Sequence, residues 1–488
     1  MAERAVLAID EGTTNSKAIL VSGHGDIIAS GSAPVPIEHP KSGWVQQDAE
    51  AIWAATLQAI AECTNASPAT DVVAIGISNQ RESIMIWDRK TGAPCGPVIT
   101  WQCRRTSADC DALKQQGHEP DVIARTGLPL DPLFPPTKVA WLLDHYGGER
   151  RDICVGTIDS WLIWKLSGGA VHATDRSNAA RTQLFHLADL RWDASLCNLF
   201  GVESAMLPEV YDSGHVFGST KNVGPLADGI PIASAIGDSH AALFGHGAFG
   251  QGDSKVTFGT GSSVMTTIPA FVVPPNGITT TIAWSLNGEP TYAYEGNILV
   301  SASILPWTAQ MLGLDGVDTL LDLAQTVSGT EGVSLVPAHV GLGSPHWNAE
   351  ARGLICGLSF GTQPAHLARA AAESMALQVQ DVYAIMAHDD DARAGRLFVD
   401  GGPSSNRFLM QILADFLDHA VTPCRNPEAS ALGAAYLAGL TTGFWPNLEA
   451  VAGLVSHDSD IVPNMPSGVR DVSLSAWRNA IARTTIVG

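Results

Sequence analysis

Short apolar runs that end at glycine- or threonine-containing turns mark the first part of the chain. Residues 5–10 (AVLAID) and 16–21 (SKAILV) have the length and composition of two strands joined by a tight turn. Residues 27–35 follow as a third strand, and 72–78 (VVAIGIS) is a continuous apolar run typical of a strand buried on both faces. The pattern predicts an antiparallel meander followed by a buried strand.

Helices are predicted where apolar positions recur every three to four residues. Asp48 is placed to cap a helix that carries Ile52, Trp53, Leu57 and Ile60. A long helix is predicted over 366–386, and a helix rich in small residues over 429–440, where close packing against another helix is expected. Alternating strands and helices favour an α/β protein.

The second half of the chain repeats the strand–turn–strand beginning of the first. Residues 255–258 are strand-like, 259–263 (GTGSS) form another Gly/Thr/Ser turn, and further strands are predicted near 279–284 and 292–295. Towards the carboxyl end, the same pattern predicts a strand, a glycine-rich turn and a helix, over 396–400, 401–406 and 408–417.

A chain of 488 residues exceeds the size that one compact core normally reaches. Gly12 and Gly259 open the two corresponding turns and lie 247 positions apart, about half the chain. We therefore predict two domains of similar build, 1–247 and 248–488, with glycines of the segment 245–252 (GHGAFGQG) as a hinge.

Charge and cysteine content exclude some classes of partner. The formal net charge of −21 opposes binding to nucleic acids and anionic membranes, whose phosphates require a basic surface. No apolar stretch reaches 18 residues, so no membrane span is predicted, and the amino-terminal residues do not resemble a signal peptide. The eight cysteines form no CxxC pair, which favours reduced thiols in a cytoplasmic protein.

Three turns combine glycine with small polar residues directly after a predicted strand: Gly12-Thr13-Thr14, Gly259-Thr260-Gly261-Ser262 and Gly401-Gly402. Backbone N–H groups and threonine hydroxyls in such turns can hold phosphate oxygens. A single turn of this kind usually has only a structural role, but three of them together favour a nucleotide-binding site. The P-loop motif GxxxxGK[ST] is absent. An acid beside a phosphate, such as Asp10, requires a divalent cation between them.

Several longer motifs follow one another along the chain: IDEGTTNSKAIL, GWVQQDAEAIW, IGISNQRES, WQCRR, GTIDSWLIWKLSGG, IGDSHAALFG, FGTGSS and VDGGPSSNRFLMQ. In this order they resemble the motifs of the FGGY carbohydrate kinases, and among these the glycerol kinases. The resemblance extends from about residue 5 to about residue 445. It implies two actin-like (ribonuclease H-like) domains with ATP and substrate in the cleft between them. It also implies an ATP-dependent kinase of a small polyol or ketose, and is compatible with a homodimer or homotetramer.

The resemblance assigns the nucleotide to the three turns and to the residues after them. Asp10 would help to place Mg²⁺. The residues implied to bind ATP are Gly12, Thr13, Thr14, Gly259, Thr260, Ser301, Gly402 and Asn406.

The same resemblance assigns the acceptor substrate to the first half of the chain. Asp238 matches the family's catalytic base, although an acid before AALFG could also cap a helix. Arg81, Glu82 and Trp101 match residues that hold the hydroxyls and carbon face of glycerol. The alternatives are a solvated charge pair for Arg81 and Glu82, and core packing for Trp101.

Three departures from the glycerol kinases fall in the acceptor pocket. Leu133 stands where they have tyrosine, Ser239 where they have glutamine, and Ser263 where they have phenylalanine. All three changes reduce side-chain size, and one removes a hydroxyl that could bond to the substrate. We therefore expect an acceptor larger than glycerol, a polyol or ketose of four or five carbons.

Two other functions share the phosphate turns. One is an actin- or Hsp70-like ATPase switch that phosphorylates no sugar. The other is a kinase-like regulator that binds sugar without turning it over. The combination of Asp238, Arg81, Glu82 and Trp101 argues against the switch, and an intact Asp10 and Asp238 argue against the regulator.

Overall fold

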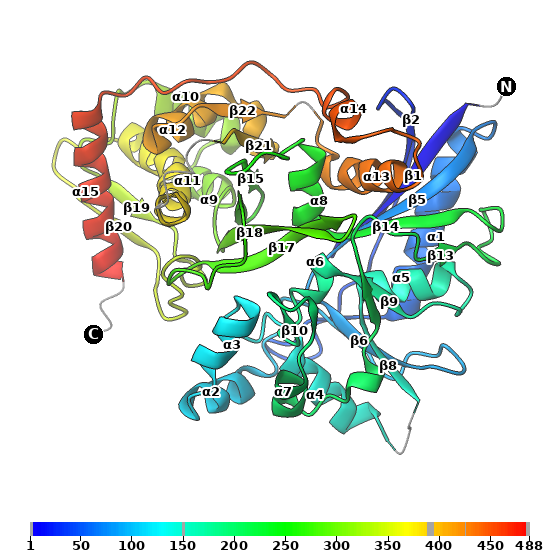
Figure 1. The fold of residues 1–488 in the computed structure, drawn as a ribbon. Coiled ribbons are helices and arrows are strands. Elements are labelled where there is room, and N and C mark those ends of the chain that lie inside the picture. The colour runs from blue at the N-terminus through cyan, green and yellow to red at the C-terminus, as the bar shows by residue number, and fades with distance from the viewer. Residues whose placement is uncertain (1–2, 149–151, 388–394, 425, 485–488) are drawn as a thin grey trace.

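Two six-stranded sheets form the frame of the molecule (Figure 1). The computed structural model describes residues 3–148, 152–387, 395–424 and 426–484. The first sheet has the order β13-β14-β5-β1-β2-β3. Its strands are β1 (Arg4–Glu11), β2 (Asn15–Ser22), β3 (Ile27–Pro34), β5 (Asp71–Asn79), β13 (Gly218–Ser219) and β14 (Pro231–Gly237).

The second sheet has the order β17-β18-β16-β15-β21-β22. Its strands are β15 (Ser254–Phe258), β16 (Ser262–Ile268), β17 (Thr279–Leu286), β18 (Glu289–Ile298), β21 (Leu397–Gly401) and β22 (Val421–Pro423). In each sheet three antiparallel strands (β3-β2-β1 and β18-β16-β15) are followed by two that run parallel to the third (β5-β14 and β21-β22). The prediction of two halves of similar build is thus confirmed, while the boundary at 247/248 stays a prediction.

One predicted turn is shorter than expected. Ser262 and Ser263 belong to β16 because they pair with Ile298 and Asn297 of β18. The turn is therefore 259–261 rather than 259–263. The other predicted strands and helices are present, with bounds that differ by a few residues.

Helices from both halves cover the first sheet. α1 (Ala49–Ala66) lies against β2 and β3, and the predicted cap is present, since the Asp48 side chain accepts from the Ala51 N–H at 2.9 Å. α8 (Asp238–Gly245) and α13 (Ala429–Thr441) cover the other face; α13 comes from the second half of the chain (Figure 1). α13 contacts α8 closely, because a Cβ on Gly433 would meet the carbonyl oxygen of Ala241.

A segment between β5 and β14 forms a smaller layer below the two sheets (Figure 1). Its strands β7 (Val98–Ile99), β6 (Ile84–Asp88) and β8 (Ile153–Thr157) form a four-stranded sheet together with β4 (Gln46–Gln47), which comes earlier in the chain, between β3 and α1. Around it lie α2 (Ser107–Gln115), α3 (Glu119–Thr126), α4 (Pro136–Tyr146), α5 (Ile158–Leu166), β9 (Ala173–Asp175), α6 (Arg176–Ala179), β10 (Phe185–His186), β11 (Arg191–Trp192), α7 (Ala194–Phe200) and β12 (Glu209–Tyr211).

Helices of the second half pack on one face of the second sheet. The core there joins Val256 and Val264 to α9 (Ile304–Met311), α10 (Gly316–Gln325), α11 (Pro364–Met386) and α12 (Arg407–Leu417). α14 (Leu448–Ala452) and α15 (Ser467–Thr484) follow, the latter beside the two-stranded sheet of β19 (Ser334–Val336) and β20 (Leu354–Cys356). Within the described residues, no helix is both long and apolar enough to span a membrane.

Candidate active site

The carboxyl ends of three parallel strands bring the first group of predicted site residues together. β1, β5 and β14 are neighbours, and Asp10 lies opposite Ser78 in the register of β1 and β5. Arg81 and Glu82 come two and three residues after the end of β5, and Asp238 directly follows β14. Carboxyl ends of adjacent parallel strands share one sheet edge, where ligands of α/β proteins commonly bind.

Asp10 is a partly buried acid with little compensating charge. Ser78 Oγ donates to its Oδ1 atom at 2.6 Å. Burial, with a smaller contribution from the negative charge of Asp238, raises the pKa of Asp10 to about 6. Lys17, its cross-strand neighbour, pairs with Glu428 at 2.6 Å. Asp10 therefore occupies a place where a cation would be stabilising.

Asp238 is the first residue of α8 and does not cap it, because the cap position is held by Gly237. Its Oδ1 atom accepts hydrogen bonds from the Ser239 N–H at 2.6 Å and from Arg81 Nε at 3.1 Å. The side chain remains 40% exposed. The carboxylate is thus oriented by two donors and still accessible, as a base that meets a substrate hydroxyl requires.

Arg81 and Glu82 are not a solvated pair, since their exposed fractions are 8% and 5%. An Arg81 terminal nitrogen lies 2.7 Å from Glu295 Oε1. Arg181 Nε donates to Glu82 Oε1 at 2.6 Å. Glu82 has φ 61°, in the left-handed region that a residue with a Cβ seldom occupies and that is enriched at functional sites.

Sequence reasoning missed Arg181 and Glu295, which are both fully buried. They pair with each other at 2.7 Å. A signal for Glu295 was present, because an acid within the strand segment YAYEGNI has to be paired if that strand is buried. No comparable signal marks Arg181.

Trp101 connects the predicted acceptor residues to the first of the predicted phosphate turns. Its Nε1–H donates to Thr13 Oγ1 at 3.0 Å. The buried Lys138, also missed in the sequence, donates to the carbonyl oxygens of Thr100 at 2.8 Å and Leu133 at 3.0 Å. Burial lowers the pKa of Lys138 to about 7. This lysine fixes the two predicted pocket residues Trp101 and Leu133 relative to each other.

The first two phosphate turns are held by their own backbones. Gly12 N–H donates to the Asn15 carbonyl at 2.9 Å, and Thr14 is exposed. In the second turn Thr260 is exposed, and its carbonyl accepts from the Ser301 N–H at 2.8 Å. Ser301 itself is fully buried and its hydroxyl accepts from Ser262 Oγ at 2.7 Å. Ser301 thus supports the turn rather than presenting its side chain to solvent.

The third turn lies beside the second, because Phe258 and Gly401 are partners in β15 and β21. Gly401 has φ 87°, and a Cβ there would meet the Phe258 carbonyl, so this position requires glycine. Gly402 is exposed with open space around it. Asn406 caps α12 by accepting from the Leu409 N–H at 3.1 Å.

The register of the second sheet places four polar residues in one row across its strands. Asp400, Thr257, Ser263 and Asn297 are successive partners from β21 to β18. The Ser263 hydroxyl is buried, and no described residue is its hydrogen-bond partner. Ser239, by contrast, lies on α8 next to Asp238. Asn297 was not recognised in the sequence.

Two duplicated sheets with acids and glycine turns at their strand ends define a two-domain, actin-like kinase architecture. The N-terminal domain of the FGGY family of carbohydrate kinases matches residues 5–245, and the C-terminal domain of that family matches 254–442. The chain belongs to the FGGY family of carbohydrate kinases, whose members are phosphotransferases. This membership sets aside the ATPase switch as the function of the chain.

The chain is 45% identical to an apulose kinase of Pectobacterium atrosepticum, covering 99% of this chain and 98% of the relative. It is 42% identical to a glycerol kinase of Staphylococcus haemolyticus, covering 99% of both chains. Among solved structures, Plasmodium falciparum glycerol kinase with ADP matches with a TM-score of 0.94 and 29% identity, covering 100% of this chain and 99% of that one.

Proposed function

We propose that this carbohydrate kinase transfers the γ-phosphate of ATP to a terminal hydroxyl of a polyol or ketose, with Asp238 as the general base. The observation that carries the proposal is the position of Asp238, accessible and oriented by Arg81, on the sheet edge that also holds Asp10. A carboxylate that accepts the hydroxyl proton during transfer contributes roughly 10²–10⁴ in rate.

The remaining residues orient the acceptor and the phosphates. Arg81 and Glu82 provide one donor and one acceptor for substrate hydroxyls, and Trp101 provides an apolar face for the carbon chain. In-line transfer depends mainly on such positioning and on charge neutralisation. The hydrogen bond from Trp101 to Thr13 keeps the acceptor side at a fixed distance from the phosphate turn.

Mg²⁺ fits the site, because Asp10 is a partly buried carboxylate whose pKa is raised by burial and, to a smaller extent, by the negative charge of Asp238, and a bound cation would offset both effects. A Mg²⁺ ion bound with ATP needs only one or two protein carboxylates. When bound, Mg²⁺ neutralises phosphate charge. We assign Asp10 to it, directly or through water.

The nucleotide would lie along the three glycine turns. Gly12, Thr13, Thr14, Gly259 and Thr260 offer backbone N–H groups and hydroxyls to the phosphates. Gly402 and Asn406 would border the adenosine, and the open space at Gly402 supports that assignment. The matching glycerol kinase structure contains ADP.

The acceptor is, in this proposal, larger than glycerol. The side chains of Leu133, Ser239 and Ser263 are smaller than the tyrosine, glutamine and phenylalanine of glycerol kinases, so they would leave more room for the acceptor. One relative is an apulose kinase and another a glycerol kinase, so both compounds belong in the test.

The test is a coupled ADP assay with glycerol, apulose and a panel of four- and five-carbon polyols and ketoses. We expect one of the larger acceptors to have the highest kcat/KM. The matched variant Leu133→Tyr/Ser239→Gln/Ser263→Phe restores the side chains of glycerol kinases and should shift the preference towards glycerol. The size argument is wrong if glycerol is already the best acceptor of the unchanged enzyme. The kinase proposal is wrong if no acceptor accelerates ADP release.

We propose that the reaction takes place in the cytoplasm, because the cysteine pattern of the sequence, with no CxxC pair, favours reduced thiols. A homodimer or homotetramer stays a prediction.

A further inference from the structure

We propose that Glu295 is a positioning residue that aims Arg81 directly, and Glu82 through Arg181, at the acceptor substrate. The inference rests on the proposed function, because it concerns how the acceptor residues of that site are held. Glu295 makes no contact with a reacting group in this scheme; it acts through the two arginines.

The five side chains form one continuous series of ion pairs. Asp238 Oδ1 lies 3.1 Å from Arg81 Nε, and a terminal nitrogen of Arg81 lies 2.7 Å from Glu295 Oε1. The other oxygen of Glu295 lies 2.7 Å from a terminal nitrogen of Arg181. Arg181 Nε in turn lies 2.6 Å from Glu82 Oε1. One oxygen of Glu295 is therefore linked through Arg81 to Asp238, and the other is linked through Arg181 to Glu82.

Glu295 is the one member of this series that comes from the second sheet. Its neighbour Gly296 faces α11, because a Cβ there would meet a methyl group of Val382. Successive strand residues point to opposite faces, so Glu295 points away from α11, to the side where the other four members lie. The series thus ties residues of the first half of the chain to a strand of the second half.

The negative charge of Glu295 holds the two arginines in place. Burial opposes ionisation of Glu295, but the guanidinium charges of Arg181 and Arg81 outweigh it and lower the pKa of Glu295 to about 2. Without this negative charge, the two buried guanidinium groups would lose the anion that lies between them, a loss that is strongly destabilising. Each would keep a single carboxylate partner, Asp238 for Arg81 and Glu82 for Arg181. Arg81 would then turn towards Asp238, and Arg181 would draw Glu82 away from its position.

The test is the variant Glu295→Gln, which keeps the size of the side chain and removes its charge. Steady-state kinetics are measured with glycerol and with erythritol as acceptors, and with ATP varied separately. We expect the acceptor KM to rise about 10-fold and kcat to fall about 10-fold, while the KM for ATP changes less than about 2-fold. A purely structural role would lower the active fraction and the melting temperature but leave the acceptor KM unchanged.

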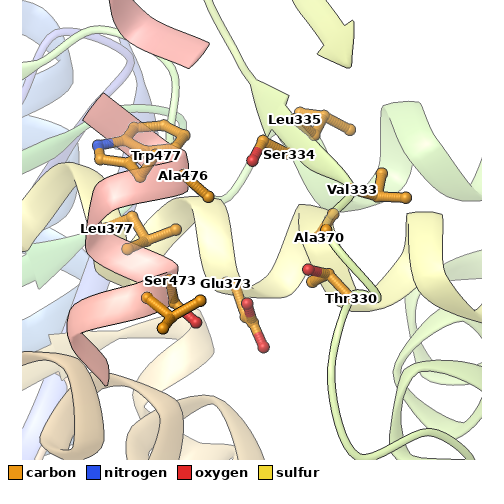
Figure 2. A pocket seen from close by; sticks show the side chains of 12 residues that line it. Thr330, Val333, Ser334, Leu335, Ala370, Glu373, Leu377, Ser473, Ala476 and Trp477 are labelled. Carbon is orange, nitrogen blue, oxygen red and sulfur yellow. The ribbon is translucent and has the colours of Figure 1, made fainter. Parts of the chain in front are cut away.

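Glu373→Gln is the matched control, because Glu373 is also a buried glutamate paired with an arginine, Arg369, at 2.7 Å. It lies on α11, beside a small cavity between α11, β19 and α15 (Figure 2). This control should lose some stability and retain the acceptor KM.

Three outcomes would overturn the inference: an unchanged acceptor KM in Glu295→Gln, an equal rise in the KM for ATP, or the same rise in the control. If Glu295→Gln does not fold, Glu295→Asp serves in its place, since its shorter side chain keeps the charge but cannot reach both arginines. It should show the same selective rise in acceptor KM, and an unchanged KM would overturn the inference. If the proposed function itself is wrong, the unchanged enzyme will show no acceptor-dependent ADP release. This result differs from failure of the Glu295 inference, which would appear only in the variants.

Discussion

His172 packs edge-on against the Trp87 ring at a centroid distance of 5.1 Å. Its Nδ1 atom lies 3.4 Å from an Arg89 nitrogen and its Nε2 atom 3.0 Å from the Val155 carbonyl. Since arginine only donates, Nδ1 accepts and Nε2 carries the proton. The ring is therefore held neutral, and burial lowers the pKa of His172 from 6.5 to about 4.

This pKa shift predicts how stability depends on pH. Between pH 6.5 and about 4 the unfolded chain takes up a proton on His172 more readily than the folded protein does. The contribution of the neutral His172 ring to the stability of the fold is therefore present above pH 6.5 and is lost as the pH falls towards 4. Urea unfolding of His172→Gln across this range should show a shallower pH dependence than the unchanged protein. The exposed His39→Gln is the control, and equal slopes for all three proteins would refute the prediction.

Only some of the residues around the proposed acceptor site could be predicted from the sequence. Arg81, Glu82 and Asp238 were predicted from their motifs, and the structure brings them into one series of ion pairs. Arg181 and Glu295 were not predicted, because their partners are 99 or more positions away along the chain. Such a contact is fixed by how the sheets assemble, which no local pattern encodes.

Element-level packing depends on glycine where α13 crosses α8. Gly433→Ala would place a Cβ against the Ala241 backbone, so we expect destabilisation of roughly 1–3 kcal/mol from overpacking. Gly468→Ala is the matched control: it also lies in a helix, α15, but its Cβ would meet nothing within 4 Å. There, alanine should be neutral or stabilising by up to about 1 kcal/mol. Thermal and urea unfolding of both variants test the sign of each change in stability. Equal changes in the two variants would contradict a close contact between α13 and α8 at Gly433.

Strands with a clear pattern were predictable, and very short ones were not. β1, β2 and β5 have eight or nine residues, and each contains a continuous apolar run (AVLAI, AILV and VVAIGI) that can be recognised in the sequence. β4 and β7 contain two residues each, too few for any periodicity, so the four-stranded sheet of β4, β6, β7 and β8 escaped prediction. Trp101 and Leu133 belong to the segment around that sheet, which is why their mutual arrangement through Lys138 was also unforeseen.

At the scale of the whole molecule, the two halves are interlocked. α13 belongs to the second half in sequence but shares a core with Val6, Ala8 and Ile19 of the first sheet. A fragment of residues 1–247 would expose this apolar face to water, at a cost of about 25 cal/mol per Å². We predict that the fragment does not fold by itself and binds the dye ANS, whereas the complete chain unfolds in one transition. A stable, cooperatively unfolding fragment would contradict the prediction.

The proposed phosphoryl transfer depends on activation of the acceptor hydroxyl by the Asp238 carboxylate. This role is tested by the kcat of Asp238→Asn, measured with saturating ATP and the best acceptor of the panel. We predict a loss of about 10²–10⁴ in kcat that is much larger than any change in the KM values, with the fold intact by circular dichroism. A kcat within about 3-fold of the unchanged enzyme, with acceptor phosphorylation confirmed by product analysis, would contradict it.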